Sequence, residues 1–247
     1  MTDESLAVVK TLGNPEGPHA LAREWIITRL ADWFGLQTFD IAQLEISDFE
    51  EITNGKDNGL AEPGMAVATR FEQGKNWDGK STTLSLLENP EDISKIVVFD
   101  TWVRNRDRHR PPSRQNLGNV FLSEENASKG RFVLKAIDHT HCLAEGDLNA
   151  KIKQLANVRD ETLYGLFPGF YSRIDNSQVT IALDRMQEAD RPMLMEVIGA
   201  LPREWSVSPD AIVSLVDFLL NRASFLTEQL PAKLIKAVQQ NLEGFEE

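Results

Sequence analysis

Apolar positions near the N-terminus follow two periods, one typical of strands and one typical of a helix. The run 6–12 (LAVVKTL) predicts a short strand, and a glycine-containing turn follows it. From His19 to Phe34 apolar residues recur every three or four positions, which predicts a helix that ends at the C-cap signal Gly35. Two more strands are predicted, one within residues 39–53 and one at 65–71, with an exposed loop at 54–64 between them.

Two further strands and a series of helices are predicted for the rest of the chain. The segments that begin at Asn119 and Arg131 are short, apolar and bounded by Gly, Asn and Ser, as expected of paired strands. Residues 82–87 and 90–99 are expected to be largely helical, and helical spacing dominates after Leu143. The later helices are predicted at 151–156, 168–174, 177–186, 192–201, 209–226 and 230–242, with a break at 202–209.

Composition narrows the class of protein. The chain has 247 residues, of which 41% are hydrophobic, enough for a sizeable core. Its formal net charge of −12 argues against general binding to nucleic acid or to anionic membranes. One cysteine excludes an intrachain disulfide framework, and the acidic N-terminus lacks the plan of a signal peptide. No apolar run reaches the roughly 18 residues of a membrane span, so we expect a soluble, cytoplasmic protein.

Most of the candidate chemistry lies between Val97 and Leu143. Asp107 is in a loop before one predicted strand, Asn119 begins that strand, and Asp138 ends the next one. A hairpin would bring Asn119 and Asp138 close together. A carboxylate can accept the proton of an attacking hydroxyl, while amide and carboxylate oxygens suit Mg²⁺. The arrangement is therefore typical of phosphoryl transfer from a nucleotide.

The same residues resemble those of a known family. The pattern DxWxxNxDR…N…IDH is similar to that of the HipA-like kinases, which belong with a larger kinase fold that includes the phosphoinositide kinases. The resemblance implies that Asp107 is the catalytic Asp and that Asn119 and Asp138 bind the metal. In those families the Asn usually follows the Asp by about five positions, whereas Asn119 follows Asp107 by twelve (119 − 107). Asn116 is therefore a rival ligand, and we prefer Asn119 because the strand 120–122 follows it directly.

Arginines gather around Asp107 in an otherwise acidic chain. Their charge either attracts phosphate near the transfer site or balances nearby acids in a solvated loop. We expect Arg108 to be the one with a catalytic role. The group consists of Arg104, Arg106, Arg108, Arg110 and Arg114.

The N-terminal segment VVKTLGNPEGPHALAREWIITRLADWFGL resembles the start of many HipA-like domains. The resemblance implies that Lys10 contacts the phosphates of the nucleotide and that Glu24 pairs with Lys10 to hold it in place. The predicted strand at 65–71 would then enter the hinge between two lobes, where backbone groups bind adenine. By position, those backbone groups belong to Arg70, Phe71 and Glu72.

One part of a kinase is not accounted for by the resemblance. Kinase small lobes usually carry a hairpin with a Gly-containing loop before the Lys strand, and here only Met1 to Ser5 precede it, without glycine. That loop is either missing, supplied by a small partner chain, or replaced by the Gly13–Gly17 loop, whose N–H groups could face phosphate ahead of a helix.

The resemblance as a whole implies an α+β, two-lobed protein-kinase-like fold. Its reduced N-terminal lobe would span residues 1–72 and its mostly helical C-terminal lobe residues 73–247. It implies an enzyme that uses ATP and Mg²⁺ to phosphorylate a serine or threonine hydroxyl of a protein, and it allows autophosphorylation and a role in a toxin–antitoxin module. A lipid or small-molecule acceptor stays open.

Two rival hypotheses belong to other classes of protein. The first is a degenerate kinase fold that binds a nucleotide or a partner protein without transfer, as the missing glycine loop and the long Asp–Asn spacing suggest. The second is a zinc protein that uses His139, His141 and Cys142, although structural zinc usually needs four ligands.

Overall fold

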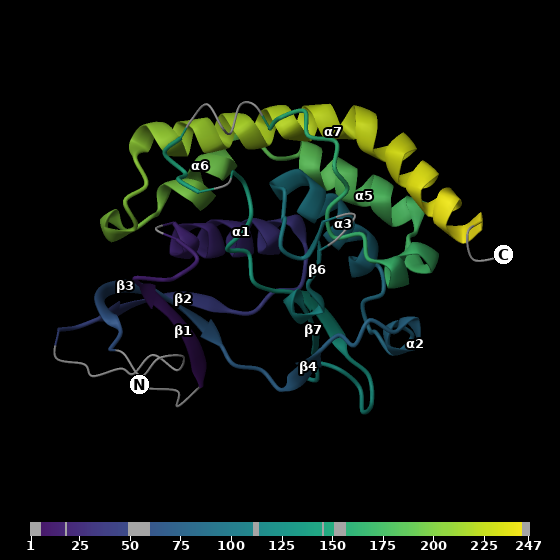
Figure 1. Cartoon of the computed structure of the whole chain (residues 1–247), viewed down its shortest axis with the longest axis horizontal. Coiled ribbons are helices and arrows are strands. Elements are labelled where there is room, and N and C mark those ends of the chain that lie inside the picture. The colour runs from purple at the N-terminus through teal and green to yellow at the C-terminus, as the bar shows by residue number, and fades with distance from the viewer. Residues whose placement is uncertain are drawn as a thin grey trace.

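The computed structural model of the chain describes residues 6–17, 19–48, 60–110, 114–144, 146–150 and 157–243. Within these residues the strands form two three-stranded antiparallel sheets and a short ribbon, and the longer helices lie on one side of the sheets (Figure 1). The strands are β1 (Ala7–Leu12), β2 (Ile41–Ile46), β3 (Glu62–Arg70), β4 (Gly74–Asn76), β5 (His109–Arg110), β6 (Arg114–Gln115), β7 (Val120–Ser123) and β8 (Val133–Ala136). The helices are α1 (Ala20–Phe34), α2 (Ser81–Leu84), α3 (Asp92–Val103), α5 (Asn176–Gln187), α6 (Arg191–Gly199) and α7 (Pro209–Glu243), with 3₁₀ turns η1 (Leu117–Asn119), η2 (Pro168–Arg173) and η3 (Arg203–Trp205).

The first sheet has the strand order β1-β3-β2, so β3 is its central strand. β3 begins at Glu62, three residues before the predicted start, so the prediction of a loop up to Gly64 was wrong at its end. Pairing on both sides explains the difference, because Glu62 lies opposite Leu12 and Gly64 lies opposite Ile46. Ladder pairing thus outweighs the turn preference of a Pro-Gly pair. Residues 54–59 of the predicted loop lie outside the described residues.

The second sheet has the order β4-β7-β8 and contains the predicted hairpin. Val120 pairs with Ala136 and Ser123 with Val133. Extension of this register beyond the ladder sets Asn119 opposite Ile137, and the Ile137 N–H donates to the Asn119 carbonyl at 3.3 Å. The hairpin therefore places Asn119 beside the residue that precedes Asp138.

Helix α1 lies between the first sheet and the other long helices (Figure 1). It contacts β1 and β3 on one side and α3, α5 and α6 on the other. As predicted, the helix ends at Gly35, which takes the left-handed conformation at φ +88° and donates its N–H to the Asp32 carbonyl. Its apolar residues join one buried cluster that also includes residues from both sheets and from α3 to α7.

Helix α3 contains the apolar run that was predicted to be helical at 90–99. Phe99 and Trp102 have no exposed surface, as expected of core residues. The helix ends at Arg104, whose φ of +55° is left-handed, and the loop that carries Asp107 begins there. The position of α3 in the core therefore decides where this loop lies.

Helix α7 corrects the predicted break between residues 226 and 230, because it continues unbroken through Pro231. The apolar stripe explains the continuity, since Leu226, Leu230 and Leu234 are all buried on one face. Proline in a helix interior removes a hydrogen bond and bends the axis. Figure 1 shows α7 changing direction towards its C-terminal end.

The remaining predicted helices are confirmed where the structure describes them. The segments at 168–174, 177–186 and 192–201 are confirmed as helical, the first as the 3₁₀ turn η2. The helix predicted at 151–156 lies outside the described residues. None of the helices in the described part of the chain combines the length and the apolar character needed to cross a membrane.

Candidate active site

A cleft of about 300 Å³ lies between the two sheets and is closed at its back by α1. Each of these elements contributes side chains to it. The lining residues are Val8 and Lys10 from β1, Glu24 and Thr28 from α1, Phe39, Ile41, Thr69, Arg70, Phe71 and Glu72 along β2 and β3, and Asn76, Phe121, Ala136, Ile137 and Asp138 from the second sheet. Apolar side chains form much of the walls, and Lys10, Glu24 and Asp138 lie together among them, which suits a flat heterocycle attached to an anionic group.

This group of three charged side chains is organised by Lys10. Its ammonium lies 2.9 Å from Glu24 Oε2, which is the predicted pair, and 3.0 Å from Asp138 Oδ1. Burial alone would lower the pKa of Lys10, but the two carboxylates outweigh that effect and raise it. Burial would likewise raise the pKa of Asp138, but the Lys10 charge lowers it. Lys10 and Asp138 are therefore both ionised at neutral pH in this arrangement.

Asp138 has a left-handed backbone with φ +58° at the end of β8. Its Oδ1 also accepts from the Thr140 hydroxyl at 3.0 Å. Non-glycine residues rarely adopt this conformation and often do so at functional sites. The turn directs the carboxylate back towards Lys10 and into the cleft.

Two asparagines hold the carboxylate of Asp107. Asp107 Oδ2 accepts from Asn119 Nδ2 at 2.8 Å and from Asn116 Nδ2 at 2.9 Å. Asn105 Oδ1 accepts from the Asp107 N–H at 3.3 Å, a contact within the loop that holds its backbone. The structure brings both candidate ligands to Asp107, while the hairpin register sets only Asn119 beside Asp138. The amide oxygen of Asn119 and the carboxylate of Asp138 are hard oxygen donors and fit Mg²⁺ by their chemistry.

Arg108 lies in the interior rather than in the cleft. Its side chain is completely buried, and its Nε lies 2.6 Å from Asp100 Oδ2. The same guanidinium donates to the carbonyls of Asn119 and Ile137. Asp100 in turn accepts from Asn105 Nδ2 at 3.1 Å. Arg108 thus joins the loop that carries Asp107 to both strands of the hairpin, and its guanidinium is engaged by protein groups rather than exposed to the cleft.

His139 links this interior network to α1. Arg108 Nη2 donates to His139 Nε2 at 3.2 Å, so the ring proton lies on Nδ1, which faces the Thr28 hydroxyl at 3.1 Å. Thr28 Oγ1 donates to Glu24 Oε1 at 3.4 Å, and the His139 N–H donates to Glu24 Oε2 at 3.0 Å. Burial and the Arg108 charge hold the pKa of His139 well below its usual value, so the ring is neutral. Because both ring nitrogens have partners, the arrangement gives no support to the zinc hypothesis.

The described residues contain no group of three or more His, Cys, Asp or Glu side chains arranged to hold a metal ion. Cys142 is buried, and burial together with the Asp100 charge raises the pKa of its thiol well above the usual value. A buried neutral thiol is a poor metal ligand.

The predicted hinge residues Arg70, Phe71 and Glu72 also line the cleft. The Arg70 N–H donates to the Asp40 carbonyl and the Phe71 N–H to the Leu6 carbonyl, so these two donors serve the first sheet. The Glu72 side chain is buried behind the cleft, where its Oε1 lies 2.5 Å from Lys135 Nζ. The backbone from Arg70 to Glu72 therefore borders the cleft, but two of its N–H groups are already bonded.

Several residues of the site escaped the sequence analysis. Thr28 is one turn after Glu24 on α1, and this i, i+4 spacing is the signal that could have found it. Lys135 and Ser123 both bind the Glu72 carboxylate, the latter at 2.6 Å. They lie on paired strands, and only the strand register reveals that they share a partner.

The Gly13–Gly17 loop borders a separate cavity of about 380 Å³ at the other end of β1. Gly13 and Gly17 have positive φ values of +71° and +111°. Met1 to Ser5, where a glycine-containing hairpin would be expected, lie outside the described residues.

Comparison with solved structures identifies the class of fold. The chain is similar to a solved structure from Helicobacter pylori described as the proinflammatory kinase CtkA, with a TM-score of 0.59. The similarity covers 96% of this chain and 93% of that chain at 15% sequence identity. The predicted two-lobed kinase-like fold is thereby confirmed.

The family follows from the sequence itself. A family model described as HipA-like kinase matches residues 1–231, and the chain therefore belongs to the HipA-like kinases. A comparison with curated proteins finds no match. The resemblance inferred from Lys10, Asp107, Asn119 and Asp138 is confirmed at the level of the family, and the chain is a kinase.

Proposed function

We propose that this kinase uses ATP and Mg²⁺ to phosphorylate a serine or threonine hydroxyl of a protein, and that the chain itself is one such substrate. The observation that carries the proposal is the convergence of Lys10, Glu24 and Asp138 in the cleft, with Asp107 held by Asn119 nearby. Each group suits a part of phosphoryl transfer. We also propose the boundary at residue 72, where the chain passes from the first sheet to the second.

Each side chain has a defined task in the proposed reaction. Adenine would occupy the apolar part of the cleft beside the backbone of residues 70–72, and Lys10 would bind phosphate oxygens while Glu24 keeps its ammonium in place. Asn119 and Asp138 would hold Mg²⁺, which supplies charge neutralisation of the phosphates. The acceptor oxygen forms a bond to the γ-phosphorus as the bond to the β-phosphate oxygen breaks, ADP leaves, and Asp107 takes the proton of the acceptor.

The experiment is incubation of the purified protein with γ-labelled ATP and Mg²⁺, followed by mass spectrometry. Asp107→Ala and Asp138→Asn should each abolish labelling of serine or threonine, whereas the exposed Asp184→Asn should not change it. Labelling that persists in Asp107→Ala would contradict its role as the base. Transfer to a lipid or small molecule alone would overturn the proposed acceptor class.

A second candidate is nucleotide binding without transfer. It is favoured by the contact of Lys10 with Asp138 Oδ1, an oxygen that a metal ion would have to share, and by the long spacing from Asp107 to Asn119. A calorimetric titration with ATP separates the two candidates. Binding without any labelled product would support the second candidate, and the absence of binding would overturn both.

A further inference from the structure

The C-terminal end of α3 is held by groups from distant parts of the chain. The last carbonyls of a helix have no partner within the helix and must find one elsewhere. The Thr101 carbonyl accepts from Arg222 Nη2 at 2.6 Å, and the Trp102 carbonyl accepts from Arg222 Nε at 2.9 Å. The Val103 carbonyl accepts from the Leu143 N–H at 2.7 Å. A side chain of α7 therefore caps the helix that leads into the catalytic loop.

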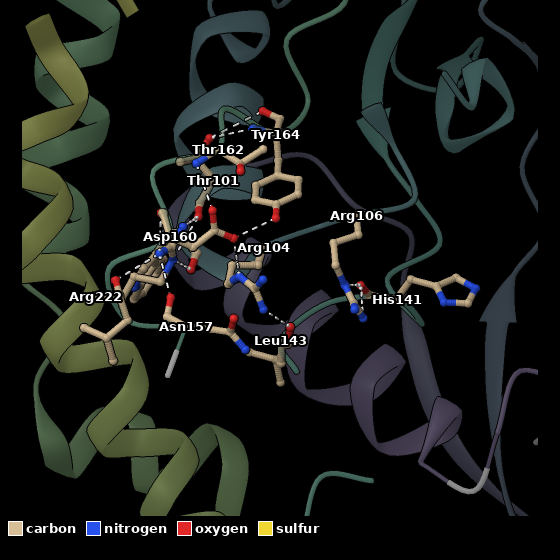
Figure 2. Close-up of polar contacts among 12 residues, drawn as sticks. Thr101, Arg104, Arg106, His141, Leu143, Asn157, Asp160, Thr162, Tyr164 and Arg222 are labelled. Atoms are coloured by element: carbon tan, nitrogen blue, oxygen red, sulfur yellow. Dashed lines mark hydrogen bonds and ion pairs between the residues drawn. The ribbon is translucent and has the colours of Figure 1, made fainter. Parts of the chain in front are cut away.

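Arg222 also binds a second segment. Its side chain has no exposed surface, and its Nη1 donates to three further carbonyls. They belong to Asn157, Val158 and Asp160, at 3.1, 3.0 and 2.8 Å (Figure 2). Burial lowers the pKa of Arg222 to about 10, so the guanidinium stays charged at neutral pH. One buried cation thus joins the end of α3 to the turn at 157–160.

Asp160 links the 157–160 turn to the start of the catalytic loop. Its Oδ2 accepts from Arg104 Nε at 2.7 Å and from the Tyr164 hydroxyl at 2.8 Å, while its Oδ1 accepts from the Thr162 N–H (Figure 2). Arg104 is the first residue of the catalytic loop, and its Nη1 donates to the Leu143 carbonyl at 3.1 Å. The loop that carries Asp107 is therefore fixed at its start by an ion pair and by the capped end of α3.

We propose that Arg222 is a positioning residue for the catalytic loop, acting through the end of α3 and through the Asp160–Arg104 pair. The proposal rests on the proposed function, since it assigns Asp107 as the base. Arg222 does not line the cleft of Lys10 and Asp138. Its loss should therefore move Asp107 relative to the acceptor while nucleotide binding is preserved.

The geometry requires a guanidinium rather than any cation. Carbonyls lie on two sides of Arg222, on α3 and on the 157–160 turn, and the planar fork reaches both sides with donors in fixed directions. Lysine would keep the charge, but a single ammonium cannot serve both sides. Arg222→Lys is therefore the sharpest variant, and Asp160→Asn is the second, because it weakens the Arg104 pair at a partly exposed position.

The experiment measures kcat for phosphoryl transfer, the ATP dissociation constant by calorimetry, and amide hydrogen exchange of residues 104–108. Both variants are compared with Leu234→Ala, a core truncation three turns further along α7. For Arg222→Lys and Asp160→Asn we expect kcat to fall about tenfold or more, the ATP dissociation constant to stay within about twofold, and exchange of 104–108 to accelerate. Leu234→Ala should lower thermal stability without that pattern.

Three results would overturn the proposal. The first is an unchanged kcat in both variants. The second is an ATP dissociation constant that rises by the same factor as kcat falls. The third is amide exchange at 104–108 that accelerates equally in Leu234→Ala. If Arg222→Lys does not fold, Asp160→Asn decides by the same criteria. If the wild-type protein transfers no phosphate, the proposed function fails, and the exchange data alone then decide whether Arg222 positions the loop.

Discussion

At the scale of single residues, the site is a group of charged side chains that stabilise one another. Lys10 lies between two carboxylates, which raise its pKa, and its charge in turn lowers the pKa of Asp138. Partly buried charges of this kind are expensive to leave unpaired. The consequence is that the loss of one group harms the remaining ones, and this interdependence can be tested by pH.

Lys10→Met should be destabilised most at neutral pH. In the wild type the folded-state pKa of Asp138 is lowered, so its contribution to stability is present at neutral pH and is lost as pH falls through that value. Without the ammonium, the main cause of the lowered Asp138 pKa is gone and burial raises that pKa, so the variant loses less stability than the wild type as pH falls. The stability gap between wild type and variant should therefore narrow from pH 7 towards pH 4.

Urea unfolding across that pH range measures the gap. The exposed Lys129→Met is the matched control and should differ little from the wild type at any of these values. A gap for Lys10→Met that stays constant or widens on acidification would contradict the coupling of Lys10 to the two carboxylates.

At the scale of elements, α1 is connected to the loop that carries Asp107 through a chain of polar side chains. The chain runs from the loop through Arg108, His139 and Thr28 to Glu24. The side chains of Arg108 and His139 have no exposed surface. Buried polar networks are stable only when every member has a partner. Removal of one hydroxyl should therefore be costly.

Thr28→Val keeps the shape of the side chain and removes its hydroxyl. The buried Nδ1–H of His139 then loses its acceptor, and we expect a loss of about 1–3 kcal/mol in the free energy of unfolding, with slower transfer because Glu24 is less well held. Thr180→Val, on the exposed face of α5, removes a hydroxyl that bonds only within its own helix and should change stability by less than about 0.5 kcal/mol. Equal effects of the two substitutions would argue against the network.

Pro231 gives α7 a local weakness in an otherwise well-packed helix. Alanine restores the missing backbone donor and removes the ring clash, although it also raises the conformational entropy of the unfolded chain. Pro231→Ala should therefore increase the free energy of unfolding by about 2 kcal/mol. The urea midpoint should rise at unchanged slope, while the exposed Lys236→Ala should leave it nearly unchanged. A lower midpoint for Pro231→Ala would mean that the bend is needed for packing.

At the scale of the whole molecule, two sheets and α1 enclose the cleft, and one core joins the segments that form it. A ligand held by both sheets must stabilise the folded chain as a whole. By mass action, Mg²⁺–ATP at about 100 times its dissociation constant should add about 2.7 kcal/mol, which corresponds to a rise in Tm of roughly 5–10 °C for a chain of this size.

Differential scanning fluorimetry measures that rise. It should shrink when a chelator removes Mg²⁺ and in Asp138→Asn, but it should persist in Asp184→Asn. A shift that is insensitive to both Mg²⁺ removal and Asp138→Asn would mean that Asp138 does not hold the metal.

The sequence predicts the secondary-structure elements of this molecule well and the contacts between distant residues poorly. Helical periodicity identified α1, and short apolar runs bounded by turn residues identified β1 and the β7–β8 hairpin, because both signals are local. The Lys10–Glu24 pair was expected from the family pattern. Arg222 gave no signal, because its five donors meet only backbone carbonyls, and these have no residue type to recognise. The sequence analysis divided α7 at 227–229, whereas the buried stripe of Leu226, Leu230 and Leu234 runs across that point.

The cleft joins residues that are made at very different times during synthesis. Lys10 and Asp138 are separated by 128 positions, and the cap of α3 comes from α7, near the end of the chain. Contacts this distant form late in folding. A nascent chain still on the ribosome therefore has Lys10 long before the end of α3 is capped, and this part of the fold is complete only after the last helix has docked.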